Sequence, residues 1–100
     1  MKGYALGERL DGKDPYDIYA LIAYYKNGPF SVAEEFKPYT KLPMVSEALK
    51  IIDENFENLK SNGPERVGYF LYTNDEEMRE RAITDAYMNV KEFLKLLGNP

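Results

Sequence analysis

Apolar residues recur at intervals of three and four along most of this chain, which is the spacing of one face of an α-helix. The longest such stripe lies in the last quarter of the sequence and reaches Gly98. Its members are Met78, Ala82, Ala86, Val90, Phe93, Leu94 and Leu97. A Ser/Thr/Asn residue followed three positions later by Glu often begins a helix, and Asn74 with Glu77 fits that pattern.

A first helix is expected to begin at Asp14. This residue is a candidate N-cap, Pro15 suits the first helical position, and Asp17 falls where a carboxylate can reach back to the cap. A left-handed Gly28 is expected to end the helix. The apolar stripe of this helix consists of Ile18, Leu21, Ile22 and Tyr25.

Two more helices are expected in the middle of the chain. Ser31 and Glu34 form a possible capping box for a short helix through about Tyr39, whose length Pro38 limits. The next helix is expected from about Pro43 to the corner at residues 62–63. Its stripe consists of Val45, Ala48, Leu49, Ile52, Phe56 and Leu59.

The segment that follows Pro64 is compatible with two structures. Val67, Phe70 and Leu71 are helically spaced, although residues 67–72 taken alone also suit a buried strand. Helix is favoured because no partner strand is visible. The sequence therefore predicts an all-α fold, a single domain over residues 1–100, built as a bundle of about five helices joined by Gly-Pro corners.

The tripeptide Asn-Gly-Pro occurs twice, at residues 27–29 and 62–64. Two copies could mark a duplicated helical hairpin. The simpler interpretation is two tight corners, since Gly after one helix and Pro at the start of the next is a common junction. The corner interpretation is favoured because the helices before the two copies differ in length and pattern.

Composition narrows the range of functions. Hydrophobic residues make up 44% and charged residues 30%, as in an ordinary globular domain. The net charge of -4 argues against a sequence-independent hold on nucleic acid. No apolar run is long enough to span a membrane, and no signal-peptide core follows the N-terminal residues, so a cytoplasmic protein without membrane contact is expected.

The chain contains neither Cys nor His. This excludes a disulfide framework, a thiolate nucleophile, an imidazole base and a Cys/His zinc site. Any chemistry would rest on carboxylates, Lys, Arg, Tyr or Ser. No cofactor and no bound metal are expected.

The strongest candidate for function is the charged segment around the first helix start. Asp11, Asp14 and Asp17 are spaced by three, with Arg9 and Lys13 among them. Clustered carboxylates can serve as a base or hold a cation, and a nearby cation can neutralise a phosphate. The spacing does not match a calcium loop. The structural alternative is that Asp14 and Asp17 only cap the helix and complement its dipole.

Other polar groups suggest structural roles. Tyrosines surround the first helix and suit core or rim packing, although they could also stack on a base or meet another subunit. Two further acidic groups are expected to be solvated helix faces or helix starts. The tyrosines are Tyr16, Tyr19, Tyr24 and Tyr25; the acidic groups are Asp53, Glu54 and Glu57, and Asp75, Glu76, Glu77 and Glu80.

The opening segment resembles the late motif of nucleotidyltransferase-fold proteins of the abortive-infection AbiEii toxin type. The matching residues are Lys2, Ala5-Leu6 and Arg9, followed by Lys13-Asp14-Pro15-Tyr16-Asp17-Ile18-Tyr19 and apolar residues. In that family the motif lies at the junction between a catalytic α/β domain and a helical C-terminal region. The resemblance implies that Lys2, Asp14 and Asp17 face a nucleotide site, with Arg9 and Lys13 as phosphate contacts.

The chain lacks the Gly-Ser element and paired aspartates that bind metal and nucleotide in this superfamily. Because phosphoryl transfer depends on metal and positioning, the chain is not expected to be catalytic alone. The resemblance implies a helical C-terminal region whose partner is a catalytic domain, with Met1 an internal methionine and with self-association through an apolar face. The alternative is a free-standing acidic helical module that binds another protein.

Overall fold

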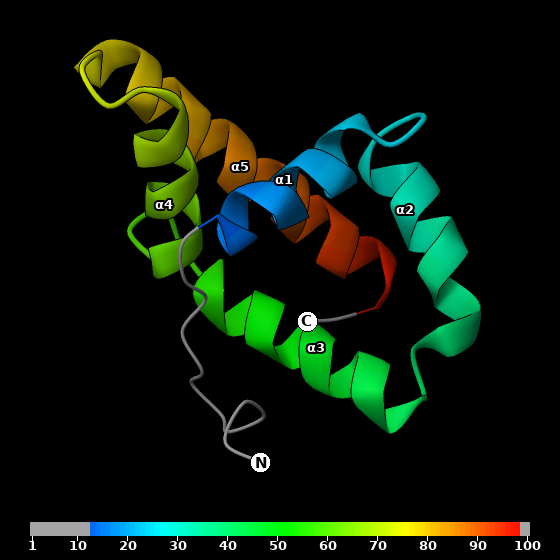
Figure 1. Ribbon diagram of the computed structural model, residues 1–100. Helices are drawn as coiled ribbons and strands as arrows, with labels where there is room; N and C mark the ends of the chain where they lie inside the picture. The colour runs from blue at the N-terminus through cyan, green and yellow to red at the C-terminus, as the bar shows by residue number, and fades with distance from the viewer. Residues whose placement is uncertain (1–12, 99–100) are drawn as a thin grey trace.

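Helices make up most of the part of the chain that the structure, a computed structural model, describes, which is residues 13–98 (Figure 1). No strand occurs within this range, so the predicted all-α fold is confirmed and residues 67–71 are helical. The α-helices are α1 (Asp14–Tyr24), α2 (Pro29–Phe36), α3 (Pro43–Asn55), α4 (Asn62–Leu71) and α5 (Glu76–Leu96), with a 3-10 helix η2 (Lys37–Tyr39) after α2.

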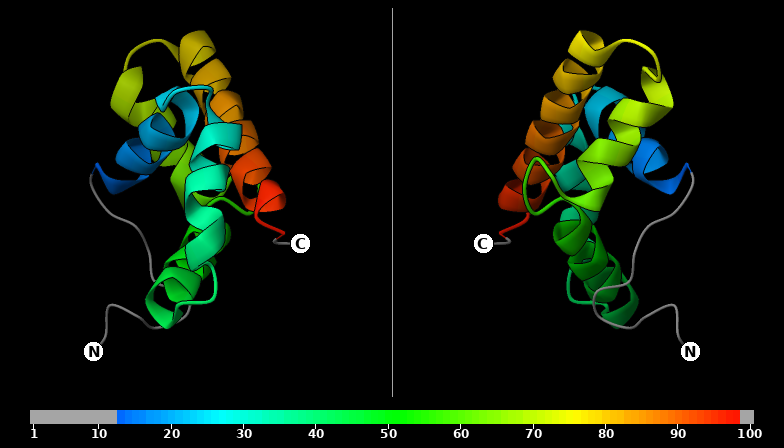
Figure 2. Two further views of the ribbon diagram at one scale, coloured as in Figure 1. Left: turned by 90° about the vertical axis from the view of Figure 1, so that its right-hand side faces the viewer. Right: turned by 90° about the vertical axis from the view of Figure 1, so that its left-hand side faces the viewer.

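Helix α5 is the longest element and contacts each of the other α-helices. Figure 2 shows it from two sides, with α4 packed along its first half. All of its buried side chains except Ile83 belong to the predicted stripe. The Phe93 ring meets Phe36 of α2 edge to face with centroids 5.7 Å apart. Those buried within the stripe are Ala82, Ala86, Val90, Phe93 and Leu94.

The junction between α3 and α4 is tightly packed. Phe56 is completely buried, and a Cβ built on Gly63 would lie 2.5 Å from its ring. The amide of Asn62 donates to Oδ1 of the buried Asn55, at 3.0 Å, and Asn55 donates to the carbonyl of Ile51. Since α3 ends at Asn55 and α4 begins at Asn62, the prediction that Asn62-Gly63 ends the preceding helix is wrong.

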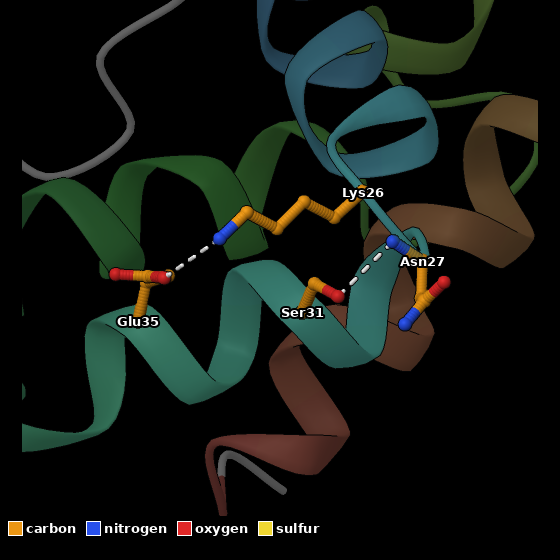
Figure 3. Close-up of polar contacts among 4 residues, drawn as sticks. All are labelled: Lys26, Asn27, Ser31 and Glu35. Carbon is orange, nitrogen blue, oxygen red and sulfur yellow. Dashed lines mark hydrogen bonds and ion pairs between the residues drawn. The ribbon is translucent and has the colours of Figure 1, made fainter.

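The turn between α1 and α2 combines two residues with positive φ, Lys26 at 51° and Gly28 at 86° (Figure 3). The Asn27 backbone N–H donates to Ser31 Oγ at 3.0 Å, and Lys26 Nζ lies 3.8 Å from Glu35 Oε2. Helix α1 therefore ends at Tyr24, three residues before the predicted corner.

The predicted capping boxes do not form. Ser31 lies inside α2, which begins at Pro29, and its hydroxyl serves the preceding turn. For α5 the cap is Asp75, not Asn74: its carboxylate accepts a hydrogen bond from the Met78 N–H at 3.1 Å. The neighbouring Asp is one position closer to the helix and satisfies the same kind of unpaired donor.

The two Asn-Gly-Pro tripeptides have different structures. Residues 27–29 form the α1–α2 turn, where Gly28 has positive φ, whereas residues 62–64 lie in the first turn of α4. At the second copy, Gly63 is required by the approach of the Phe56 ring. The tripeptides are not copies of one helical hairpin, and only the first one is a corner.

The buried face of α1 differs from the predicted stripe. It consists of Pro15, Tyr19 and Ile22, while Leu21 is 49% exposed. The Tyr19 ring is buried within the bundle, and its hydroxyl forms a hydrogen bond with Asp85 of α5. In the next long stripe Leu49 and Phe56 are buried, but Ala48 and Leu59 are exposed; Leu59 lies beyond the end of α3.

Among residues 13–98 no helix has the length and apolar character needed to cross a membrane.

Replacing Gly63 with Ala is expected to destabilise the fold by about 1–3 kcal/mol, the range for overpacking a core. The added methyl would lie 2.5 Å from the Phe56 ring and 2.6 Å from the Asn55 carbonyl oxygen, which outweighs the higher helix propensity of Ala. Urea unfolding followed by circular dichroism measures the change. A variant as stable as the parent would contradict the close packing of α3 on α4.

Candidate functional site

The start of α1 brings three of the predicted site residues together on the surface. Lys13 precedes the helix, and Asp14 and Asp17 lie in its first turn; all three are exposed. Lys2 and Arg9, as well as Asp11, lie outside the described residues. The described part of the candidate site is therefore one cation and two carboxylates at one helix end.

Asp14 does not cap α1, contrary to the sequence prediction. The N-cap is Lys13, with φ -90° and ψ -5°, and no side chain caps this end of the helix. The Lys13 backbone is already helical, so the helix begins one residue earlier than the Asp14 cap requires. No hydrogen bond or ion pair joins the Asp14 side chain to any other residue of the 13–98 range. Its remaining structural role is the favourable effect of a negative charge near a helix N-terminus.

Asp17 has a weak partner. Its Oδ1 lies 3.9 Å from Lys13 Nζ, and the two side chains are 58% and 61% exposed. Exposed pairs of this kind contribute about 0–1 kcal/mol. The Asp17 backbone N–H donates to the Lys13 carbonyl at 2.9 Å, as in an ordinary helical turn.

An aromatic pair lies beside the charged helix start. The Tyr16 ring packs on Phe70 of α4, with centroids 4.7 Å apart and planes inclined by 33°. Phe70 is still 50% exposed, and Tyr69 next to it is 53% exposed. The spacing of Phe70 suggested a core residue, and no sequence signal distinguishes it from one. The structure thus adds an exposed aromatic surface at this end of α1.

Tyr19 is the most buried polar side chain of the motif, at 3% exposure. The Tyr19 hydroxyl donates to Asp85 Oδ2 of α5 at 2.5 Å. The hydroxyl oxygens of Tyr19 and Tyr24 lie 3.2 Å apart. Sequence reasoning missed Asp85. Tyr19 and Asp85 are 66 residues apart in the sequence. Within the α5 pattern, Asp85 is simply a polar position between Ala82 and Ala86.

Burial raises the pKa of Tyr19 above its ordinary value, and the hydrogen bond to Asp85 raises this pKa further. Removing the proton would leave a phenolate in a covered site, beside a carboxylate. Tyr19 is therefore a fixed hydrogen-bond donor, and it connects α1 to α5.

The other acidic residues are mostly exposed. Asp53 lies 3.7 Å from Lys91 and links α3 to α5, and Glu77 lies 3.5 Å from Arg81 within α5. Glu54, Glu57, Glu76 and Glu80 are exposed. Within residues 13–98 no three acidic side chains are grouped closely enough to hold a metal ion.

Comparison of the chain with protein-family models, with curated proteins and with solved structures finds no match.

Replacing Tyr19 with Phe is expected to flatten the loss of stability in alkaline solution. A tyrosine in the unfolded chain loses its proton near pH 10, whereas folded Tyr19 keeps its proton because its pKa is raised. The folded state then binds more protons than the unfolded state, so stability falls as pH rises above about 10. One such group contributes a slope of up to about 1.4 kcal/mol per pH unit.

The measurement is urea unfolding at several pH values between 9 and 12, for the parent and for Tyr19→Phe. Tyr39→Phe, which removes a hydroxyl from an exposed ring, is the matched control and should follow the parent. Equal slopes for the parent and Tyr19→Phe would show that the Tyr19 hydroxyl is not held as described.

Proposed function

We propose that this chain is the helical, non-catalytic part of a nucleotidyltransferase-like protein. In this proposal the start of α1 borders a nucleotide site whose catalytic residues belong to a separate domain or polypeptide. The observation that carries the proposal is the exposed position of Asp14, which has no partner among the described residues and does not cap its helix.

The interpretation that Asp14 and Asp17 serve only to cap the helix is weakly supported. A capping Asp typically contributes about 1 kcal/mol, and the Asp that does so in this fold is Asp75 of α5. Asp14 makes no such bond, and Asp17 makes only an exposed ion pair with Lys13. Two exposed carboxylates and one exposed cation at this helix end are therefore available to a ligand.

The chemistry of the three groups suits the edge of a nucleotide site. Lys13 can neutralise a phosphate, and the family resemblance adds Arg9 as a second phosphate contact and Lys2 as a residue that faces the nucleotide site. Asp14 and Asp17 offer oxygen acceptors to a ribose or a base. Phosphoryl transfer also needs a bound metal and exact positioning of the reactants, which in this proposal come from the catalytic partner.

The aromatic surface beside the charged helix start suits the docking of that partner. Phe70 is half exposed, and Tyr16 continues this surface onto α1. Tyr69 is also half exposed, and its ring lies against Arg79 of α5. Aromatic residues are enriched in the cores of protein interfaces. A catalytic domain packed there would lie directly beside Lys13, Asp14 and Asp17.

The second candidate is a free-standing helical interaction module, which the same aromatic surface favours. In that case the partner would contact Phe70 and Tyr69, and the charged helix start would have no specific role. The two candidates differ in whether Asp14 and Asp17 are needed for function.

Two results are expected from the purified chain. First, it should transfer no label from a radiolabelled nucleoside triphosphate in the presence of Mg²⁺, because positioning and metal binding must come from another domain.

Second, Asp14→Ala combined with Asp17→Ala should change the free energy of unfolding by less than about 1 kcal/mol, since only dipole and exposed-pair effects are lost.

Asp75→Ala is the matched control for stability, because it removes one carboxylate that does cap a helix; about 1 kcal/mol should be lost. Nucleotide transfer by the isolated chain would contradict the proposal. So would a double variant that loses clearly more stability than Asp75→Ala, because Asp14 and Asp17 would then be structural residues.

A further inference from the structure

A hollow of about 330 Å³ lies between the end of α1, the end of α4 and the first half of α5. We call it the Tyr-Asp hollow. The residues that matter for its chemistry are Tyr19, Tyr24, Leu71, Tyr72, Arg81 and Asp85. It shares no residue with the charged start of α1, so it is a separate candidate site.

The hydroxyl protons in the Tyr-Asp hollow have a defined direction. Tyr19 has one proton and donates it to Asp85 Oδ2 at 2.5 Å. The 3.2 Å contact between the Tyr19 and Tyr24 hydroxyls must therefore use the proton of Tyr24. Both hydroxyl protons are therefore used in hydrogen bonds, from Tyr24 to Tyr19 and from Tyr19 to the Asp85 carboxylate. What the tyrosines and Asp85 offer to a ligand is lone pairs, so they select a hydrogen-bond donor.

Asp85 forms no ion pair with any cation of the described residues. Arg81 precedes it by one helical turn, yet the Arg81 guanidinium pairs with Glu77 instead, at 3.5 Å between Nη2 and Oε2. A carboxylate that already accepts a short hydrogen bond and has no counter-ion favours a positively charged ligand.

The remaining walls suit the apolar part of such a ligand. Tyr24 and Tyr72 add aromatic rings, whose faces attract cations, and Leu71 adds aliphatic surface. The volume is at the lower end of the range for small-molecule sites, roughly 300–1,000 Å³. A short alkyl chain carrying one charge therefore fits better than a large or anionic ligand.

We propose that the Tyr-Asp hollow binds an alkylammonium group through Asp85, with the hydroxyl of Tyr24 as a second acceptor. The ligand is either a free small amine or the side chain of a lysine in a peptide. Both present the same ammonium on a four-carbon chain.

The experiment is a titration of the ¹⁵N-labelled full chain with n-butylammonium, followed by NMR chemical shifts. Saturable binding is expected, with the largest shifts around Tyr24, Tyr72 and Asp85. Asp85→Asn keeps the shape of the side chain and removes the charge, and should weaken binding by about tenfold or more. Glu92→Gln removes the same charge two turns further along α5, from a residue that does not line the hollow, and should leave the affinity within about twofold of the parent.

Two further measurements, on Arg81→Gln and with n-butanol, do not depend on whether Asp85→Asn folds. Arg81→Gln removes the nearby positive charge and should strengthen binding of n-butylammonium a few-fold. n-Butanol, which has a similar size and no charge, should not saturate. If n-butanol binds as well as n-butylammonium, or if Arg81→Gln weakens binding, the hollow does not recognise a cation.

Nα-acetyl-lysine amide distinguishes the two sources of the ammonium group. Binding at least as tight as that of n-butylammonium identifies a lysine side chain as the ligand, and binding of the free amine alone identifies a small amine. Shifts that rise linearly with both compounds, without saturation, would overturn the proposal.

Discussion

The burial of one apolar stripe on α5 is the constraint on which the rest of this structure depends. Helices α1, α2, α3 and α4 all contact α5, and the stripe supplies Val90, Phe93 and Leu94 to the common core. An isolated helix of this size gains little from propensity alone, so most of its stability comes from packing. Two of the other helices have specific contacts with α5: α2 through Phe36, whose ring packs on Phe93, and α1 through Tyr19, which donates to Asp85 beside the stripe.

Sequence periodicity predicted this stripe and the all-α fold because α5 has apolar residues on one face and polar residues elsewhere. It failed where a local signal competed with tertiary packing. Gly63 looked like a helix end, yet it lies within α4 because only a glycine leaves room for the Phe56 ring. Tyr19 was expected in the core or at its rim but not as part of the buried stripe of α1; it is buried, and a carboxylate 66 residues away accepts its hydroxyl proton. A single sequence contains no sign of contacts so distant.

Part of the candidate site could also be predicted from the sequence pattern. The grouping of Lys13, Asp14 and Asp17 at one helix start follows directly from their order in the chain. Whether Asp14 caps the helix depends on the backbone angles of Lys13, which spacing cannot determine. Phe70 reaches the site from α4 and was not predicted, since its position in an apolar stripe concealed its exposure. The chain thus has a charged helix start beside a partly exposed aromatic pair, Tyr16 and Phe70.

In the function proposed above, this helical bundle works beside a nucleotidyltransferase-like catalytic domain. Sequencing the DNA immediately upstream of the Met1 codon, and translating it in all three forward frames, tests this proposal most directly. A Gly-Ser element followed by paired aspartates is expected there, in the same frame or in an adjoining one. An unrelated gene in that place would contradict it and would favour the free-standing interaction module.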